Sequence, residues 1–439
     1  MLSREDNELL CRVGPGTPMG QLLREYWLPF LKSSDVERGG QPLRVKLLSE
    51  DLVAFRDTSG RVGLLGEHCS HRATSLALAR NEDNGLRCVY HGWMYDVSGR
   101  CIDMPNEPEE TRFADKIRHP AYACTERNGI VWTYMGPREV PPALPDLEWN
   151  MVPEDQVVIW RNLQFNNWVQ GLEGNIDSSH LSFLHTRLTA DGDGFGGGNR
   201  GLWYADKTPR MEVRATDYGV MYGAGRKEDP DNSYWRVTQF LMPFYGMFAP
   251  VSPAEIPLQW WIPLDDHTVM KWDVRLNPNR PITEEERARL GFGDPGGFAE
   301  PNRFDPYTQF RLAADQSNGW LLDYEAQEER RFSGVPSVNL QDKAVQETMG
   351  PIVKRHIEHL GTSDAMIIQV RKRLLNAAKA LRDHGTTPPG VAQPESYRVR
   401  SATTILPNGT DWLEAVGDKL VAFTDRPVES AEAQIRARV

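Results

Sequence analysis

Cysteine is scarce in this 439-residue sequence, and the number of cysteines is odd. A disulfide framework is therefore not expected, and unpaired cysteines in a long chain are typical of a reducing compartment. Long apolar runs are also absent, because no stretch reaches the roughly 18 residues that a transmembrane helix needs. The N-terminal segment MLSREDNELLCRVG carries charges where a signal peptide would need apolar residues. These absences predict a cytoplasmic protein without a membrane segment. The cysteines are Cys11, Cys69, Cys88, Cys101 and Cys124.

Positive charge is not in excess either, since the net charge of the chain is −11 at pH 7. Phosphate contacts need clustered lysine and arginine, so a general nucleic-acid-binding protein is not expected. The glycine-rich stretch 186–203 lacks the preceding strand and the following βαβ unit of a dinucleotide-binding motif. It suits a solvated surface loop as well as a lid over an active site. The chain is therefore not expected to bind NADH or a flavin itself.

Cysteine and histidine are instead paired in one short stretch, EHCSHRATSLALARNEDNGLRCVYHGW (67–93). Cys69 and His71 form a C-x-H pair, and Cys88 and His91 form a C-x2-H pair. Two sulfur and two nitrogen ligands suit either structural zinc or a Rieske [2Fe-2S] cluster. In a zinc finger each arm carries one residue type, whereas each arm here carries one cysteine and one histidine. The spacing favours two loops that clasp a two-iron cluster, with a zinc-stapled scaffolding protein as the alternative.

Short strands flank these pairs. VAFRDTSGRVGLL (53–65) and MYDVSGRCIDMP (94–105) each predict two strands joined by a turn, at DTSGR and VSGR. This pattern is typical of a small antiparallel β domain. The proline-rich segment MGPREVPPALPDLEW (135–149) predicts a linker out of that domain. The length of the chain suits two domains.

A second possible metal site lies in NWVQGLEGNIDSSHLSFLHTRL (167–188), which contains Asp177, His180 and His185. Asp177 and His180 are i, i+3 neighbours on one face of a helix. His185 would lie roughly 140° further around a helix of 3.6 residues per turn, so the helix must end or bulge between the two histidines if both bind one ion. Two histidines and a carboxylate form the facial triad of non-haem Fe(II) oxygenases. The alternative to an oxygenase is a protein of another class, a Rieske electron carrier fused to a ligand-binding module. Such a carrier would not need Asp177, His180 and His185.

The chain resembles the Rieske non-haem iron oxygenases, because CSHR and CVYHGWMYD are similar to the cluster-binding loops of that family. EGNIDSSHLSFLH and QDKAVQETMGPI resemble the alpha (oxygenase) subunits of its phthalate dioxygenase-like branch. The resemblance implies that Cys69 and Cys88 bind the inner iron of the cluster and that His71 and His91 bind the outer iron. It also implies one [2Fe-2S] cluster and one mononuclear non-haem Fe(II) in each subunit.

The resemblance implies Asp342 as the third ligand of the mononuclear iron, beside His180 and His185. On chemistry alone Glu347 and Asp323 are competitors, and Asp342 could equally be a helix N-cap.

Asp177 has a different expected role, since it is placed to accept a hydrogen bond from the non-ligating nitrogen of His180. The resemblance implies that it also reaches a cluster-bound histidine of the adjacent subunit. Electrons would then pass from His91 through Asp177 and His180 to the iron, across a subunit interface. A homotrimer or a stacked hexamer is therefore expected.

The expected fold class is α+β. A Rieske [2Fe-2S] domain of small antiparallel β type is expected over residues 26–145, after an N-terminal arm at residues 1–25. The resemblance implies a larger catalytic domain over residues 146–439, with a curved antiparallel sheet wrapped around helices in the helix-grip (START-like) manner. Within it, TSDAMIIQVRKRLLNAAKALRDHG (362–385) predicts a packing helix that ends at Gly385.

The resemblance implies the oxygenase component of a multicomponent system, in which a separate NADH-dependent FMN/ferredoxin-type reductase supplies electrons. The expected reaction is cis-dihydroxylation by O2 of an aromatic carboxylate such as phthalate, isophthalate or a chlorobenzoate, in aromatic hydrocarbon catabolism. Monooxygenation of a methoxylated aromatic acid, by O-demethylation or hydroxylation, is the alternative.

Substrate contacts are the least constrained expectation. An aromatic carboxylate needs a cation or a hydroxyl donor. Ser179 and Lys207 rank first because they lie nearest to the metal motif and the glycine-rich stretch. Arg210, Arg236 and Lys271 lie in the same part of the sequence, but Arg210 and Arg214 alternate with apolar residues, which favours a solvated outer face.

Overall fold

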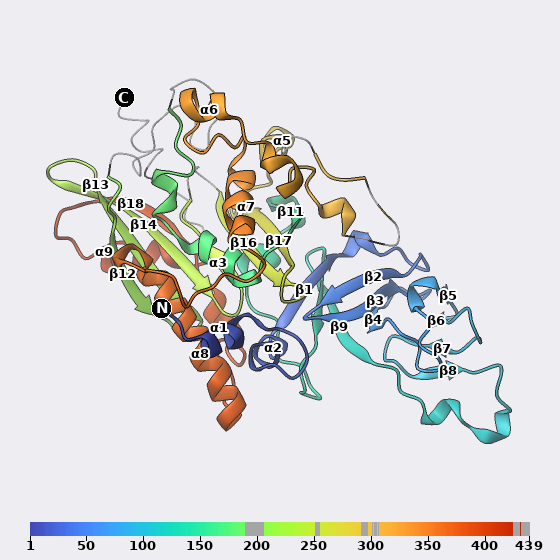
Figure 1. Ribbon diagram of the computed structural model, residues 1–439. Helices are drawn as coiled ribbons and strands as arrows, with labels where there is room; N and C mark the ends of the chain where they lie inside the picture. Colours follow the sequence, from blue (N-terminus) through green and yellow to red (C-terminus); the bar gives the residue numbers. More distant parts are fainter. Residues whose placement is uncertain are drawn as a thin grey trace.

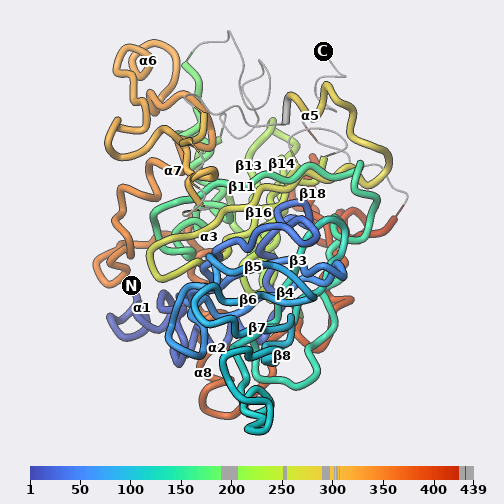
Figure 2. The backbone as a smooth tube through the Cα atoms, turned by 90° about the vertical axis from the view of Figure 1, so that its right-hand side faces the viewer, coloured from blue at the N-terminus to red at the C-terminus, as the bar shows by residue number. Residues whose placement is uncertain are grey.

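The computed structural model describes residues 1–188, 206–250, 255–290, 297–300, 302, 305, 307–424 and 431. The described residues form two β-rich parts that lie side by side, a small one built mainly from residues 27–134 and a larger one that follows it (Figure 1). Figure 2 views the molecule from the end that carries the small part. The glycine-rich stretch 186–203, predicted to be a loop, lies almost wholly outside the described residues.

The small part holds two antiparallel sheets. The first has the strand order β1-β10-β9-β4-β3-β2, and the second has the order β5-β6-β7-β8. The strands of the first sheet are β1 (Trp27–Lys32), β2 (Leu43–Leu47), β3 (Glu50–Arg56), β4 (Val62–Gly66), β9 (Ala121–Arg127) and β10 (Ile130–Tyr134). Those of the second are β5 (Arg80–Glu82), β6 (Gly85–Arg87), β7 (Met94–Tyr95) and β8 (Cys101–Asp103).

The two predicted hairpins are β3-β4 and β7-β8. In both turns an aspartate side chain accepts hydrogen bonds from backbone N–H groups of the turn. Asp57 accepts hydrogen bonds from the N–H groups of Ser59 (2.9 Å) and Arg61 (2.8 Å). Asp96 does the same with Ser98 (2.9 Å) and Arg100 (3.1 Å). Aspartate favours this side-chain-to-backbone turn. Local sequence therefore determines both hairpins.

Within its described residues, the larger part contains an eight-stranded antiparallel sheet of order β11-β17-β16-β15-β14-β13-β12, with β18 paired to β14. The family resemblance implied an antiparallel sheet in this part of the chain. Its strands are β11 (Val157–Gln164), β12 (Arg210–Ala215), β13 (Gly219–Lys227), β14 (Asn232–Leu241), β15 (Tyr245–Met247), β16 (Ile256–Pro263), β17 (Val269–Leu276) and β18 (Ala402–Pro407).

Helices pack on this sheet, with α3 (Trp168–Ile176) against β15 and β16 and α8 (Ala365–His384) against β12 and β13. The helix predicted at 362–385 is α8, and Gly385 ends it in the left-handed conformation (φ 64°), as predicted. The other described α-helices are α1 (Arg4–Cys11), α2 (Pro18–Arg24), α5 (Glu284–Leu290), α6 (Tyr324–Glu329), α7 (Val338–Thr348) and α9 (Trp412–Val416). The predicted α+β fold class, with a small antiparallel part and a larger sheet that packs on helices, is confirmed.

Aromatic packing joins the two parts. Trp149 stacks on Trp132 of β10, with ring centroids 5.9 Å apart, and lies 4.3 Å from the ring of Trp260 in β16. All three indoles are at most 2% exposed. Large buried aromatic surfaces contribute strongly to such contacts. The small part is therefore held in a defined position against the larger sheet.

Candidate metal centres and active-site cavity

Two tight loops carry the cysteine and histidine pairs. Cys69 and His71 lie between β4 and β5, and Cys88 and His91 lie between β6 and β7. In the second loop Gly92 (φ 80°) donates its N–H to Cys88 O at 3.0 Å, and a Cβ there would lie 2.6 Å from Pro105. Glycine is needed at this turn because another residue would be both strained and crowded.

The four side chains form two pairs at the tips of these loops. The rings of His71 and His91 have centroids 4.3 Å apart, and Trp93 stacks on His71 at 4.5 Å. Both cysteines are only 3% exposed. Burial raises the pKa of the Cys88 thiol, although the backbone N–H groups of Tyr90 and His91 favour its thiolate form.

The donor set fits a two-iron cluster better than zinc. His71 Nδ1 is buried and has no hydrogen-bond partner, as expected of a nitrogen that binds a metal. A tetrahedral zinc would bring all four ligand atoms within about 4 Å of one another. No three of these four residues bring ligand atoms within 4.8 Å of one another. Two separate ligand pairs suit the two irons of a [2Fe-2S] cluster.

A second set of candidate metal ligands meets where α3 ends. The helix stops at Ile176, because Asp177 is extended (φ −81°, ψ 125°), and a short 3₁₀ helix, η7 (His180–Ser182), follows. The sequence predicted a break between His180 and His185, and the break in the structure comes before His180. It turns both imidazoles to one point, with their Nε2 atoms 3.2 Å apart.

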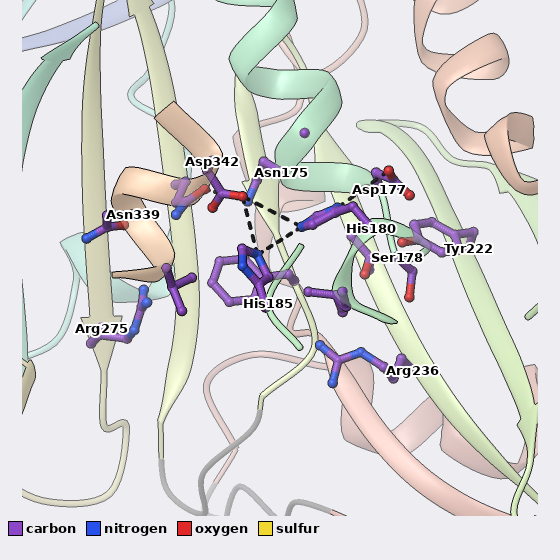
Figure 3. Close-up of a pocket in the computed structure, with 16 residues that line it drawn as sticks. Asn175, Asp177, Ser178, His180, His185, Tyr222, Arg236, Arg275, Asn339 and Asp342 are labelled. Atoms are coloured by element: carbon purple, nitrogen blue, oxygen red, sulfur yellow. Dashed lines mark hydrogen bonds and ion pairs between the residues drawn. The ribbon is translucent and has the colours of Figure 1, made fainter. Parts of the chain in front are cut away.

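Asp342 completes this set from α7 (Figure 3). Its Oδ1 lies 3.3 Å from His185 Nε2 and 3.8 Å from His180 Nε2. Among the described residues, this is the one group of three metal-binding side chains whose ligand atoms all lie within 4.8 Å of one another. Burial raises the pKa of Asp342, but the two histidines lower it by more than burial raises it. The pKa is therefore below its ordinary value, and the carboxyl group stays ionised. The set fits the two-histidine, one-carboxylate site of non-haem iron.

The competing carboxylates lie elsewhere. Asp323 caps α6 by accepting a hydrogen bond from Ala326 N. Glu347 accepts hydrogen bonds from Phe165 N (2.9 Å) and Trp320 Nε1 (2.8 Å). The alternative that Asp342 is an N-cap does not apply, since Ser337 caps α7.

Each imidazole has an outer partner. Asp177 Oδ2 lies 3.4 Å from His180 Nδ1, as the sequence predicted. Gln341 Oε1 lies 2.7 Å from His185 Nδ1, and Gln341 Nε2 donates to Val335 O at 2.8 Å. Sequence reasoning missed Gln341. Its position beside Asp342 was the one available signal, and only the helical geometry of α7 shows that it faces His185.

The candidate ligands open into a cavity of about 70 Å³ that is partly open to solvent. Arg236 of β14 and Arg275 of β17 lie on opposite sides of it (Figure 3) and are 3% and 6% exposed. Apolar contacts come from Leu181, Phe248 and Val338. The chemistry of this lining therefore suits an apolar ring with an anionic substituent.

The other expected substrate contacts lie outside this lining. Ser179 is not among the described residues that line the cavity, and its backbone N–H donates to Asp177 Oδ1 at 2.6 Å. Lys207 is exposed, with Nζ 4.9 Å from the centroid of the Phe183 ring. Lys271 is buried, where it donates to Asn339 at 3.0 Å and pairs with Asp273. The solvated outer face expected for Arg210 and Arg214 agrees with exposed side chains, at 64% and 46%.

Comparison with known proteins agrees with this geometry. A model described as the Rieske [2Fe-2S] domain matches residues 26–121, and one described as LigXa C-terminal domain like matches residues 133–434. The chain is 39% identical to the 3-chlorobenzoate-3,4-dioxygenase oxygenase subunit of Comamonas testosteroni, over 96% of this chain and 99% of that one. It is 36% identical to the phthalate 4,5-dioxygenase oxygenase subunit of Pseudomonas putida, over 94% of each. The 5,5'-dehydrodivanillate O-demethylase oxygenase subunit of Sphingobium sp. is 37% identical over 62% of each chain.

The fold, the two ligand sets and these matches define a Rieske non-haem iron oxygenase, whose cofactors are a [2Fe-2S] cluster and a mononuclear iron. Within that class the chain belongs to the family of oxygenase alpha subunits in the phthalate dioxygenase-like branch. It is the terminal component of a multicomponent system and needs a separate electron-transfer partner. In the described part of the chain, no helix is long and apolar enough to cross a membrane.

Proposed function

We propose that the chain cis-dihydroxylates an aromatic carboxylate, with O2 and with electrons from NADH that arrive through a separate reductase. The observation that carries this proposal is the cavity, which is lined both by two buried arginines and by the convergent set of His180, His185 and Asp342. A guanidinium can bind a carboxylate through two parallel hydrogen bonds. Such binding would fix the acid group and direct the ring toward the metal ligands.

The residues take the following roles in this proposal. Cys69, His71, Cys88 and His91 hold the [2Fe-2S] cluster, and His180, His185 and Asp342 hold the mononuclear iron. When bound, the cluster supplies electrons and the iron supplies open positions for O2. Asp177 and Gln341 fix the directions of the two imidazoles by accepting from their Nδ1–H groups, which leaves each Nε2 free to bind the metal.

The separation of the two centres supports a proposal for the assembly. The cluster loops lie at the far end of the small part, away from α3 and α7 (Figure 1). We propose that the cluster of one subunit serves the iron site of its neighbour, through His91, Asp177 and His180, in a homotrimer or a stacked hexamer. The reductase is of the FMN and ferredoxin type, and the complex is cytoplasmic. We place the domain boundaries at residues 25/26 and 145/146, since β1 begins at Trp27 and the proline-rich segment ends near Trp149.

The second candidate function is monooxygenation of a methoxylated aromatic acid. The similarity to an O-demethylase oxygenase subunit favours it. The same arginines would hold the acid group, and the position of the ring relative to the metal ligands would decide whether a ring edge or a methyl group reacts.

Binding experiments test the role of the arginines. Loss of a hydrogen bond to a charged group costs about 1.5–3 kcal/mol. Arg236→Met and Arg275→Met should each weaken the binding of a benzoate that is a substrate by about ten- to a hundredfold, without loss of iron. Arg210→Met, on an exposed side chain, is the matched control and should bind as the wild type does. Unchanged affinity in both cavity variants would contradict the proposed acid site.

The metal assignment has a simpler test. Purified protein should be brown, with the visible absorption and the EPR signal of a reduced Rieske centre. Colourless protein with stoichiometric zinc would contradict the proposal.

A further inference from the structure

His119 occupies a buried position behind the first cluster loop, just before β9. Its side chain is 3% exposed, and both ring nitrogens have partners. Nε2 lies 2.8 Å from Gly66 O, and Nδ1 lies 2.8 Å from Ser70 Oγ. Ser70 is the residue between Cys69 and His71. The imidazole therefore ties the loop that carries one cysteine and one histidine ligand to the end of β4.

The partners determine the protonation of this ring. A backbone carbonyl can only accept, so Nε2 must carry the proton that is donated to Gly66 O. Nδ1 then accepts a hydrogen bond from the Ser70 hydroxyl group. Burial lowers the pKa of His119, which agrees with a neutral ring. Ser70 thus has a fixed acceptor that belongs to neither metal centre.

The same ring supports a direct contact with a cluster ligand. The imidazole stacks on the phenol ring of Tyr95, with centroids 4.5 Å apart and ring planes at 26°. Tyr95 Oη lies 3.2 Å from Cys69 Sγ. A metal-bound thiolate has no proton, so the phenol must be the donor in this bond.

A hydrogen bond to a ligand sulfur affects the cluster electrostatically. The reduced cluster carries one more negative charge than the oxidised cluster. A donor aimed at the sulfur stabilises the reduced state more, and hydrogen bonds to the sulfurs are among the factors that set the reduction potential. The Tyr95 hydroxyl group should therefore raise the potential, provided that its ring is held in place.

We propose that His119 is a positioning residue for the [2Fe-2S] cluster, which holds the Tyr95 hydroxyl group against Cys69 by stacking and holds the Cys69–His71 loop through Ser70. The inference rests on the proposed role of Cys69 as a cluster ligand. It assigns to His119 an effect on the driving force for electron transfer, although its hydrogen bonds and its ring stacking go to Ser70, Gly66 and Tyr95 rather than to a metal ligand.

The reduction potential of the cluster in the full-length holoenzyme tests this inference. Tyr95→Phe removes only the donor and should reduce the equilibrium constant for cluster reduction about tenfold, which is a fall of about 59 mV for a one-electron couple. His119→Leu removes the stacking ring and the acceptor of Ser70, and it should lower the potential in the same direction. If His119 acts through Tyr95, His119→Leu should add little further change in the Tyr95→Phe background.

Two further variants separate the effect of ring stacking from the effect of the hydrogen bond to Ser70. His119→Phe keeps a ring for stacking but loses both hydrogen bonds, so its potential should stay closer to that of the wild type than the potential of His119→Leu. Ser70→Ala removes only the tie to the loop. Tyr122→Phe is the matched control, because that hydroxyl group donates to Glu50 and to no cysteine. Cluster content is measured in every variant from the visible absorption.

The outcomes separate the inference from the assignment on which it rests. Cys69→Ser should lose the Rieske signal, and retention of that signal would contradict the ligand role of Cys69. Normal cluster content with an unchanged potential in both Tyr95→Phe and His119→Leu would overturn the inference alone. Equal shifts from His119→Leu with and without the Tyr95 hydroxyl group would show that His119 does not act through Tyr95, and an unchanged potential in Ser70→Ala would then overturn the inference, since neither proposed route would remain. If His119→Leu fails to hold the cluster, the potentials of Tyr95→Phe and His119→Phe decide.

Discussion

Gln341 Oε1 lies 2.7 Å from His185 Nδ1. The other ring nitrogen of His185, Nε2, faces Asp342, which follows Gln341 directly in the sequence. Gln341 is itself fixed, because its amide nitrogen donates to Val335 O. One turn of α7 thus provides both a proposed metal ligand, Asp342, and the group that would orient another, His185.

Removal of this acceptor should weaken the iron site without changing the cluster. Outer partners of metal-binding histidines typically affect metal affinity by about 10–100-fold. Gln341→Leu should therefore lose mononuclear iron on dialysis against a chelator at about 10–100-fold lower chelator concentration than the wild type. Gln341→Glu keeps an acceptor and should retain iron. Equal iron retention in the leucine variant and the wild type would show that Gln341 does not orient His185.

The third ligand has a sharper test. Asp342→Ala should abolish mononuclear iron and turnover, while the Rieske spectrum stays normal because the cluster ligands lie in the other part of the molecule. Asp323→Ala is the matched control, since that carboxylate caps α6 and should leave the iron content unchanged. The assignment fails if Asp342→Ala binds iron stoichiometrically and Asp323→Ala or Glu347→Ala does not.

Asp177 tests the proposed link between the two centres. Asp177→Asn keeps the shape of the side chain but removes the negative charge beside His180 Nδ1. Both metals should remain bound, while turnover and reoxidation of the reduced cluster nearly stop. Stopped-flow absorbance of the prereduced enzyme mixed with O2 and a substrate measures this rate. Normal coupled turnover in the variant would mean that Asp177 is only structural.

The buried ion pairs that Glu173 of α3 makes with two arginines should control the stability of the larger part. Glu173 accepts hydrogen bonds from Arg355 (3.1 and 3.0 Å) and from Arg371 (2.6 Å). Loss of one partner of such a pair costs about 3–5 kcal/mol. Glu173→Gln should lower the free energy of unfolding by about 3 kcal/mol in urea denaturation. Glu285→Gln, on an exposed residue of α5, should change it by less than about 0.5 kcal/mol.

The same pair predicts a pH dependence. Burial raises the pKa of Glu173, but Arg355 and Arg371 lower it by more than burial raises it. The pKa of Glu173 is therefore below the ordinary value of 4.5. A carboxylate whose pKa is lowered on folding stabilises the protein above its unfolded-state pKa, and this contribution is lost as the pH falls through the folded-state pKa. The difference in stability between the wild type and Glu173→Gln should therefore be constant above about pH 5 and shrink below pH 4.5. A difference that grows toward low pH would contradict this account.

The predictable features are those that depend on short stretches of sequence. The aspartate turns of β3-β4 and β7-β8 and the glycine that ends α8 are local, so the spacing of residues was enough to predict them. Asp342 is 157 residues from His185 in the sequence, and it was proposed as a ligand through family resemblance rather than through spacing.

The substrate contacts show where sequence proximity misleads. Ser179 and Lys207 were preferred because they lie near His180 in the sequence, but the described cavity lining includes neither residue. Arg236 and Arg275 reach the cavity from β14 and β17, and the pairing of distant strands decides which strand positions face it. Gln341 was missed for a similar reason, since nothing in the sequence places α7 beside η7.

Product analysis with labelled oxygen tests the central claim most directly. The purified oxygenase is supplied with NADH, a reductase, 18O2 and a panel of aromatic acids that includes phthalate, isophthalate, 3-chlorobenzoate and methoxybenzoates, and the products are identified by mass spectrometry. The proposed function predicts a cis-dihydrodiol that carries two labelled atoms from at least one acid. A single labelled atom, or release of formaldehyde, would favour monooxygenation instead, and oxygen uptake that no aromatic acid stimulates would contradict the proposed substrate class.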